Sequence, residues 1–160
     1  MTHPIPEQPG VLETDAIPVR ALRADDLDAI VRIDAAITGR ARRRYYEQQV
    51  AAALHERGVQ MALVAECDGL PVGFLLAAVY YGEFGLPEPV AVLESLGVHP
   101  DFRGRHVGAA LLRQLEQNLR GLGIDRVETQ VDWDQGDLLA FLRRHGFAPI
   151  PRLCLARRIG

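Results

Sequence analysis

Hydrophobic residues near the start of the chain recur every three or four positions, which is the spacing of an amphipathic helix. In the first such segment they are Leu27, Ile30, Ile33 and Ile37. Asp25 or Asp26 can cap this helix at its start, and Gly39 can end it. A second helix is predicted from about residue 45 to a stop at Gly58.

Strand patterns occupy the middle of the chain. The predicted strands are 17–22, 60–66, 71–81 and 90–98. The dipeptide Asp68-Gly69 separates the second from the third, and Asp-Gly between two strand patterns is typical of a tight hairpin. A loop with several glycines and prolines, residues 82–89, precedes the fourth strand.

An apolar stripe with helical spacing follows the fourth strand, so a helix with one face on the sheet is predicted there. Its members are Val107, Leu111, Leu115, Leu119 and Leu122. Gly123 ends this helix. The remaining patterns predict a strand over 126–133, a helix over 137–145 and two short strands within 147–159.

This order of elements, βααβββαβαββ, predicts a mixed α/β fold with four helices and a central sheet of six to seven strands. The chain has 160 residues, of which 48% are hydrophobic and 24% charged, and such a chain can bury the core of one domain. Residues 1–15, rich in proline and polar side chains, are expected to form a flexible tail. Residues 16–160 are expected to form a single domain.

Charge and composition narrow the classes of function. A net charge of −3 argues against general nucleic-acid binding, which favours basic surfaces. The sequence contains no apolar run long enough to span a membrane and no secretory signal pattern, so a cytoplasmic protein is expected. Cys67 and Cys154 are far apart and lack the spacing of a metal site, so both are expected to be buried, reduced thiols.

The most informative segment is 93–112, where a strand is followed by a basic, glycine-containing loop and the first turns of a helix. This order places backbone N–H groups from Gly104 to Ala109 at a helix N-terminus. Amides there have no helical acceptor and carry partial positive charge, which suits a phosphate. Gly104, Gly108 and Ala109 are small enough for close approach. The segment therefore predicts a phosphate site, although it has neither the P-loop nor the dinucleotide-binding glycine pattern.

The segment resembles the acyl-CoA loop of the GNAT superfamily of N-acyltransferases, whose pattern is Arg/Gln-x-x-Gly-x-Gly/Ala. The loop reads Arg103-Gly104-Arg105-His106-Val107-Gly108, after a lead-in with Val98 and Pro100. His106 stands where the family usually has its first glycine. The later stretch Ala140-Phe-Leu-Arg-Arg-His-Gly-Phe147 is similar to the helix that precedes the family's late strand. The resemblance runs from about residue 17 to the C-terminus.

The resemblance implies the cofactor site. In the GNAT fold two neighbouring strands of the sheet splay apart, and pantetheine pairs with the exposed edge of the first. Leu96, Gly97 and Val98 would then offer backbone groups to acetyl-CoA. The phosphates would meet the loop and helix start, comprising Arg103, Gly104, Arg105, His106, Val107, Gly108 and Ala109. Gln135, just before the last helix, is assigned to the same site, with helix capping as the alternative. No metal is expected.

Acetyl transfer to an amine needs a base, because an alkyl amine is mostly protonated at neutral pH. Glu94 is the leading candidate, since it is a carboxylate in an otherwise apolar strand, although a solvated position is the alternative. The family usually supplies a tyrosine as the acid for the departing thiolate. Leu142 occupies that position here, so Tyr80 or Tyr81 is the candidate acid, or none is used.

The resemblance places the acceptor beside the two early helices, where Arg40, Arg42, Arg43 and Arg44 are followed by two tyrosines. These arginines either bind an acidic group of the acceptor or form a solvated basic run. The sequence thus favours an N-acetyltransferase that acts by direct attack of a small-molecule or protein amine, as a monomer or homodimer. A non-catalytic acyl-CoA-binding module is the alternative.

Overall fold

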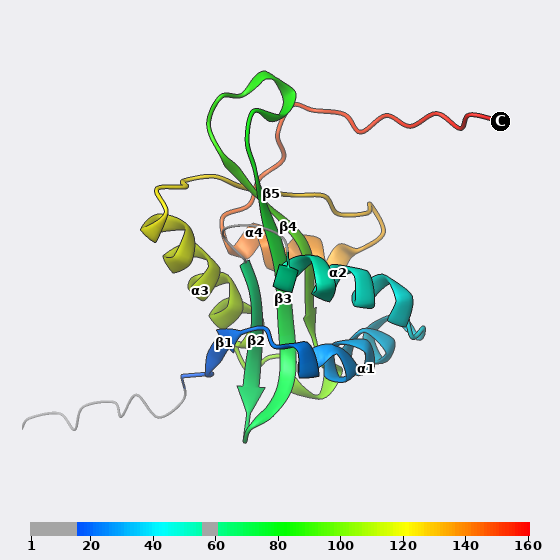
Figure 1. Ribbon diagram of the computed structural model, residues 1–160, viewed down its shortest axis with the longest axis vertical. Coiled ribbons are helices and arrows are strands. Elements are labelled where there is room, and N and C mark those ends of the chain that lie inside the picture. The colour runs from blue at the N-terminus through cyan, green and yellow to red at the C-terminus, as the bar shows by residue number, and fades with distance from the viewer. Residues whose placement is uncertain (1–15, 56–60) are drawn as a thin grey trace, which may run out of the picture. The chain divides into compact units, whose positions relative to one another are not determined.

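The computed structural model describes residues 16–55 and 61–160 (Figure 1). The predicted tail at 1–15 and the predicted helix stop at Gly58 lie outside these residues. The chain divides into two compact units, Met1–Glu128 and Thr129–Gly160. That residues 16–160 form a single domain stays a prediction.

The regular elements follow the predicted order up to the last helix. They are β1 (Val19–Ala21), α1 (Leu27–Thr38), α2 (Arg43–His55), β2 (Met61–Cys67), β3 (Leu70–Tyr80), β4 (Val90–Val98), α3 (Val107–Gly121), β5 (Val127–Thr129) and α4 (Gly136–Arg144). Short 3-10 turns precede α1, β4 and α3. The strand predicted over 126–133 is shorter than expected, because only three of its residues pair.

The five strands form one sheet in the order β1-β2-β3-β4-β5. β1 to β4 pair antiparallel, with Leu63 opposite Leu75 and Phe74 opposite Gly97. The mixed α/β class is confirmed. The expected count of six to seven strands is wrong for the described residues, because 147–160 contribute no strand.

The predicted hairpin between β2 and β3 is confirmed. Asp68 and Gly69 both have positive φ, 51° and 75°, and Cys67 pairs with Leu70. Two successive residues in the left-handed region match the twist of a tight hairpin, which is why Asp-Gly suits this turn. The turn sets the register between β2 and β3, and β3 then runs to Tyr80.

One face of the sheet packs against α1 and α2 in the first unit. Alternate residues of β2 and β3, among them Val64 and Phe74, join Ile30, Ile33 and Tyr46 in one buried cluster. Because side chains alternate across a strand, the residues between them face the other way. The helix predicted from the spacing of Leu27, Ile30, Ile33 and Ile37 is confirmed as α1. Gly39 ends α1 in the left-handed conformation.

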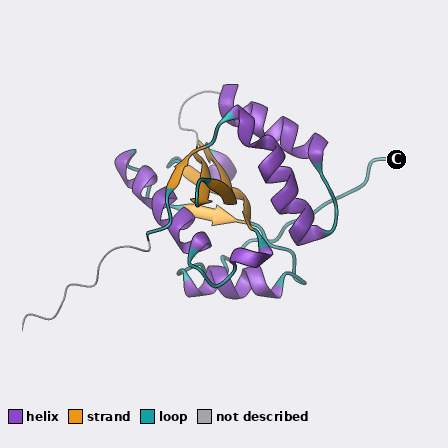
Figure 2. Ribbon diagram, turned by 90° about the horizontal axis from the view of Figure 1, so that it is seen from below, coloured by secondary structure: helices purple, strands orange, loops and turns teal. Residues whose placement is uncertain are grey.

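The opposite face carries α3, and Figure 2 shows the strands between helices. Four of the five residues predicted to form its apolar stripe are buried, namely Val107, Leu111, Leu115 and Leu119. Leu122 is the exception at 47% exposed, because the helix has ended before it. This packing fixes where the N-terminus of α3 lies relative to β3 and β4.

The start of α1 differs from the prediction. Asp26 is the N-cap residue, but its carboxylate caps no amide of α1. It accepts hydrogen bonds from both terminal nitrogens of Arg20 at 2.8 Å and from the Arg23 backbone at 2.7 Å. Burial alone would raise the pKa of Asp26, but these donors outweigh it and hold the pKa below its usual range. The carboxylate therefore ties β1 to the turn before α1.

The second unit contains the end of β5, α4 and an irregular C-terminal segment. α4 confirms the helix predicted over 137–145. Residues 147–160 form no helix or strand, so the prediction of two short strands there is wrong. Cys154 lies in this segment and is exposed, whereas Cys67 is half-buried, so the expectation of two buried thiols is also corrected. Both are free thiols.

Candidate functional site

β4 carries a bulge at Glu94, the candidate base. Leu76 pairs with Ser95 and Ala77 pairs with Leu93, so Glu94 is the extra residue between them. An extra residue bends a strand and redirects its side chain, and bulges are common next to active sites. Glu94 is exposed while its neighbour Leu93 is buried. The carboxylate is therefore presented to solvent from the middle of β4.

Tyr80 and Glu94 meet across β3 and β4. The phenol O–H of Tyr80 donates to Oε1 of Glu94 at 2.9 Å. Two residues assigned separately from the sequence, a candidate acid and the candidate base, are therefore in direct contact. Tyr81 is 69% exposed, beyond the end of β3. The structure brings Tyr80, and not Tyr81, to Glu94.

The last residues of β4 offer one edge of their backbone. Leu96, Gly97 and Val98 pair with β3 on one side. β5 lies beside the beginning of β4, where the Ala91 amide donates to the Arg126 carbonyl at 3.0 Å. Within 16–55 and 61–128, no strand pairs with the other edge of Leu96–Val98. An extended ligand could therefore add there as a strand.

The predicted phosphate loop runs directly from this end of β4. His99 caps a short 3-10 turn, Pro100–Phe102, by accepting from the Asp101 amide, and α3 starts at Val107. The first bond of α3 runs from the Ala110 amide to the His106 carbonyl at 3.0 Å. In the described part of the chain, the amides of residues 104–109 donate no hydrogen bond. They remain available to a ligand, as the helix start requires.

Gly104 and His106 give the loop its shape through positive φ angles of 75° and 62°. His106 is in the left-handed conformation that explains why a glycine is usual at its position. A Cβ at Gly104 would meet no atom within 4 Å, so the loop is open there. The guanidinium of Arg105 stacks 5.1 Å from the centre of the Phe102 ring, and Arg103 and Arg105 are both exposed. The loop thus combines open amides with two cations.

Sequence reasoning did not identify Gly73, which sets the position of this loop. A Cβ there would lie 2.7 Å from Cγ1 of Val107 and 3.3 Å from Cδ1 of Leu111. Only glycine allows the first turn of α3 to approach β3 so closely. The sign in the sequence was a lone glycine inside a strand pattern, which indicates close approach without saying of what.

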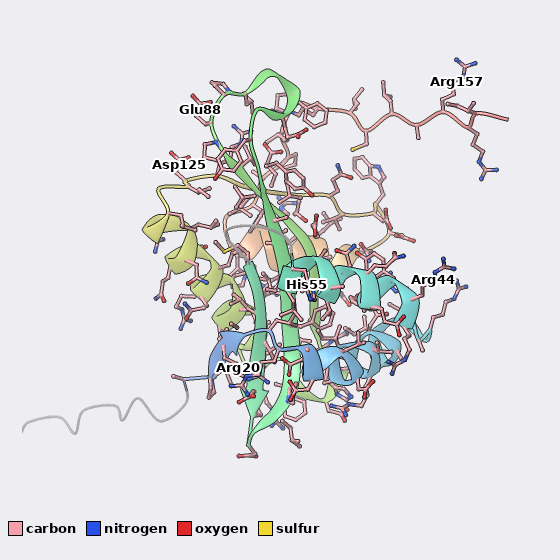
Figure 3. The ribbon with its side chains drawn as sticks, in the orientation of Figure 1. Arg20, Arg44, His55, Glu88, Asp125 and Arg157 are labelled. Atoms are coloured by element: carbon pink, nitrogen blue, oxygen red, sulfur yellow. The ribbon has the colours of Figure 1, made fainter. Side chains whose placement is uncertain are left out.

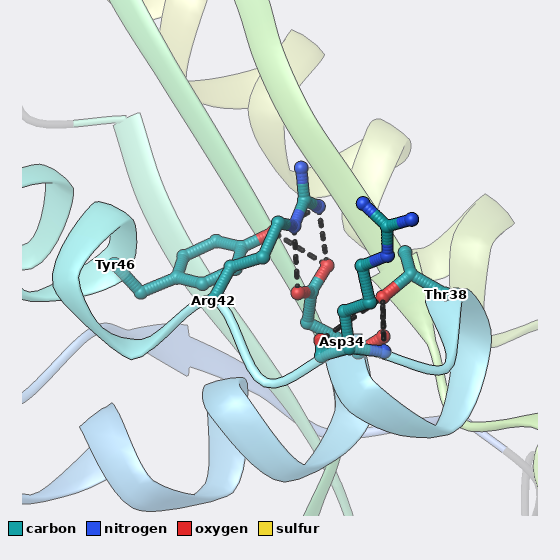
Figure 4. Close-up of polar contacts among 5 residues, drawn as sticks. Asp34, Thr38, Arg42 and Tyr46 are labelled. Atoms are coloured by element: carbon teal, nitrogen blue, oxygen red, sulfur yellow. Dashed lines mark hydrogen bonds and ion pairs between the residues drawn. The ribbon is translucent and has the colours of Figure 1, made fainter.

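Two of the four arginines of the basic run after α1, Arg42 and Arg43, form structural contacts. Asp34 is buried, and its carboxylate accepts from two nitrogens of Arg42 and from the Tyr46 hydroxyl at 3.0 Å (Figure 4). Burial, aided by the nearby Asp34, raises the pKa of Tyr46, and the hydrogen bond with Asp34 raises the pKa of Arg42. The Thr38 hydroxyl donates to the Asp34 carbonyl at 2.9 Å. This network fixes the connection between the helices.

The other arginines differ in their contacts. Arg43 donates to Asp28 at 2.6 Å, which leaves Arg40 and Arg44 as the members of the run whose side chains form no ion pair among the described residues. Arg44 projects away from α2 (Figure 3). Arg42 and Arg43 are therefore already paired with acids of this chain, whereas Arg40 and Arg44 pair with no acid among the described residues.

Two assigned residues belong to the second unit. Gln135 is the N-cap residue of α4, and its side chain caps no amide of that helix. Its backbone N–H donates to the Asp132 carbonyl at 3.0 Å. Leu142, at the position of the family's usual tyrosine, is buried. Among residues 16–55 and 61–160, no three histidine, cysteine or acidic side chains gather as a metal site requires. No helix of this part is long and apolar enough to cross a membrane.

Comparison with known families gives one match. The model of the acetyltransferase (GNAT) family matches residues 27–147, which is more than half of the chain. The matched range begins with α1 and ends just after α4, so it includes the bulged strand, the loop and α3.

Solved structures share the fold at low sequence identity. The aminoglycoside N-acetyltransferase AAC(6')-Iy, in complex with CoA, is 18% identical with a TM-score of 0.75, over 89% of this chain and 94% of that one. A ribosomal-protein-alanine N-acetyltransferase from Brucella melitensis is 20% identical with a TM-score of 0.71, over 91% and 100%. A transcriptional regulator from Bacillus halodurans is 18% identical with a TM-score of 0.75, over 89% and 99%.

Proposed function

This chain belongs to the acetyltransferase (GNAT) family, and on that premise we propose that it is an N-acetyltransferase that uses acetyl-CoA. The observation that carries the proposal is the continuity of two features. The open backbone edge of Leu96–Val98 leads directly into the loop whose amides, from 104 to 109, have no acceptor among residues 16–55 and 61–160. One ligand with an extended arm and a pyrophosphate would satisfy both.

Each part of the proposed donor fits a different feature of the chain. The pyrophosphate of acetyl-CoA would accept from the amides of 104–109, with Arg103 and Arg105 adding charge. The pantetheine amides would pair with the backbone of Leu96–Val98, and an N–H there would stabilise the oxyanion at the thioester carbon. Gln135 is proposed as a further contact. That AAC(6')-Iy was solved with CoA supports this choice of donor.

The acceptor would attack the thioester directly. A neutral primary amine forms the bond to the acetyl carbon, the carbon–sulfur bond breaks, and CoA leaves as a thiolate. Glu94 takes the proton that the nitrogen loses, directly or through water. Tyr80 donates its phenol proton to the thiolate and regains one from Glu94, so both side chains return to their starting states. The hydrogen bond between them supports this relay.

The class of acceptor is proposed only as a primary amine on a small molecule or a protein. The structurally similar enzymes include acetyltransferases named for aminoglycosides and one named for a ribosomal-protein alanine. These names span both kinds of amine. From the sequence, we also propose that the protein acts in the cytoplasm and uses no metal.

Release of CoA in the presence of amines tests this function. We expect acetyl-CoA to be consumed when the protein is incubated with a panel of small amines and peptide N-termini, and mass spectrometry should find the acetylated amine. Consumption in the absence of any amine is the control for hydrolysis. Tight binding of acetyl-CoA without release across the panel would instead favour a non-catalytic acyl-CoA-binding module.

The two tyrosines provide a matched pair of variants. Tyr80→Phe removes the phenol that contacts Glu94 and should lower kcat by about 10-fold, a cautious value because CoA thiolate is a tolerable leaving group. Tyr81→Phe makes the same chemical change one residue later, where the side chain is exposed, and should leave kcat within about 2-fold. Equal losses in both variants, or a loss only in Tyr81→Phe, would remove Tyr80 from the proposed relay.

A further inference from the structure

Gly97 lies at the centre of the open backbone edge of β4 and has no room for a side chain. A Cβ there would lie 2.6 Å from Cε1 and 2.9 Å from Cζ of Phe74, and 3.3 Å from Cδ1 of Ile37. These distances are shorter than the roughly 3.5 Å at which carbon atoms rest against each other. Phe74 is the residue directly opposite Gly97 in β3, and it is buried. Its ring therefore occupies the space that a side chain at Gly97 would need.

The backbone groups on either side of Gly97 point to the open edge of β4. The His99 amide donates to the Val72 carbonyl at 2.8 Å, so His99 faces β3. Residues of an antiparallel strand alternate between bonding to the neighbouring strand and pointing away from it, and the register has no shift over this stretch. Gly97 therefore also faces β3. The carbonyl of Leu96 and the amide of Val98, which belong to the two peptide groups joined at Gly97, point to the open edge.

A glycine at this position makes the direction of those two groups depend on packing. Glycine has the least restricted backbone of all residues, and inside a strand it lowers stability. An aromatic side chain on the facing strand can cover such a glycine and restrain it. The Phe74 ring has this position against Gly97. The ring thus restrains the peptide groups that carry the Leu96 carbonyl and the Val98 amide.

The ring of Phe74 is itself held by Tyr46 of α2. The two ring centres are 5.5 Å apart and the ring planes meet at 84°, which is an edge-on contact. Tyr46 is also buried, and its hydroxyl donates to the buried carboxylate of Asp34, which Arg42 contacts as well (Figure 4). Moving Tyr46 would leave a buried oxygen of Asp34 without one of its donors, which is costly. The network therefore keeps the Phe74 ring against Gly97.

We propose that Phe74 is a positioning residue for the acyl donor. By filling the side-chain space of Gly97, its ring fixes the Leu96 carbonyl and the Val98 amide in the directions that the pantetheine arm needs. Phe74 lies in the core and acts through the backbone of β4. The inference rests on the proposed use of acetyl-CoA, and it extends that function by giving a buried residue of β3 a role in donor binding.

Two compensating substitutions test the inference, with the affinity for acetyl-CoA measured by calorimetry. Gly97→Ala places a Cβ against the Phe74 ring, and Phe74→Leu leaves Gly97 uncovered, so each should weaken binding by about 10-fold. Leucine lacks Cε1 and Cζ, the two atoms that the new Cβ would meet. The double variant should therefore bind acetyl-CoA within about 3-fold of the unaltered protein. Losses that multiply in the double variant, or unaltered affinity in Gly97→Ala, would overturn the inference.

Leu22→Ala is the matched control for a loss of core packing. Leu22 is buried in the same core cluster, but its amide donates to Ala62 of β2, two strands away from β4. This variant should lower Tm, as Phe74→Leu does, while its affinity for acetyl-CoA stays within about 2-fold of the unaltered protein. A loss of affinity in Leu22→Ala as large as that in Phe74→Leu would make the effect one of general destabilisation and would overturn the positioning role.

ADP provides a second control, because it has the pyrophosphate of the donor but no pantetheine arm. Gly97→Ala and the unaltered protein should bind ADP equally, since the change is at the strand edge and not in the loop. An equal loss of affinity for ADP and for acetyl-CoA would contradict a role specific to the arm.

The unaltered protein separates this inference from the function on which it rests. If the unaltered protein bound no acetyl-CoA, the proposed donor would be wrong and the inference with it. If it binds acetyl-CoA and releases CoA with an amine, while the losses in the two single variants multiply in the double variant, the proposed function stands and the positioning role alone is wrong.

Discussion

The Glu94→Gln variant is expected to lose about 100-fold or more in kcat/KM at neutral pH, the scale of a lost general base. Glutamine keeps the shape of the side chain and can still contact Tyr80 but cannot accept a proton from the amine. Because an alkyl amine has a pKa of about 10, free amine accumulates as the pH rises. The variant should therefore recover part of its rate in alkaline buffer, and a pH–rate profile with one amine would show this.

Glu88→Gln is the matched control for this experiment. Glu88 is exposed in the loop between β3 and β4, so the same loss of charge occurs near β4 without a contact to Tyr80. Its pH profile should match that of the unaltered protein. A Glu94→Gln enzyme with an unaltered profile would exclude Glu94 and direct attention to ordered water.

The Gly104→Asp variant is expected to bind acetyl-CoA about 10- to 100-fold more weakly than Gly104→Asn. Both residues tolerate the left-handed conformation better than other side chains, and a Cβ at Gly104 meets no atom within 4 Å. The two variants are nearly identical in shape, so strain in the loop cancels between them. What remains is a negative charge beside the proposed phosphate site.

Calorimetry at two salt concentrations would measure this difference. The gap between the aspartate and asparagine variants should narrow as salt rises, because screening weakens the repulsion between exposed charges. Equal affinities in the two variants at low salt would mean that phosphate does not bind at this loop. Thermal melting of both variants checks that each remains folded.

The parts of the fold that were predicted correctly depend on local patterns. The spacing of apolar residues in α1 and α3, the Asp-Gly turn and the apolar run of β4 each determine structure within one segment. The C-terminal strands were not predicted correctly, because a strand needs a partner as well as a pattern. Residues 153–159 have the alternation of a strand but no partner within the described chain.

The predictions for the site divide in the same way, between features set within one segment and contacts between distant segments. The loop before α3 was predicted because its glycines and the following helix are contiguous in the sequence, and that it binds phosphate stays a prediction. The contact between Tyr80 and Glu94 was not identified as a pair, because the bulge sets the register between β3 and β4. The buried Asp34 was also missed, since a carboxylate on a predicted helix shows no sign that Arg42 and Tyr46 will meet it.

Amide hydrogen exchange with and without acetyl-CoA tests the central claim, that the end of β4 and the start of α3 form one donor site. Amides without an acceptor exchange quickly, so those of 104–109 should exchange fast in the free protein. Acetyl-CoA should slow exchange at 104–109 and within 96–98 together, in a loop and a strand end that meet at His99. Unchanged exchange in both segments at saturating acetyl-CoA, with protection elsewhere in the chain, would contradict the account.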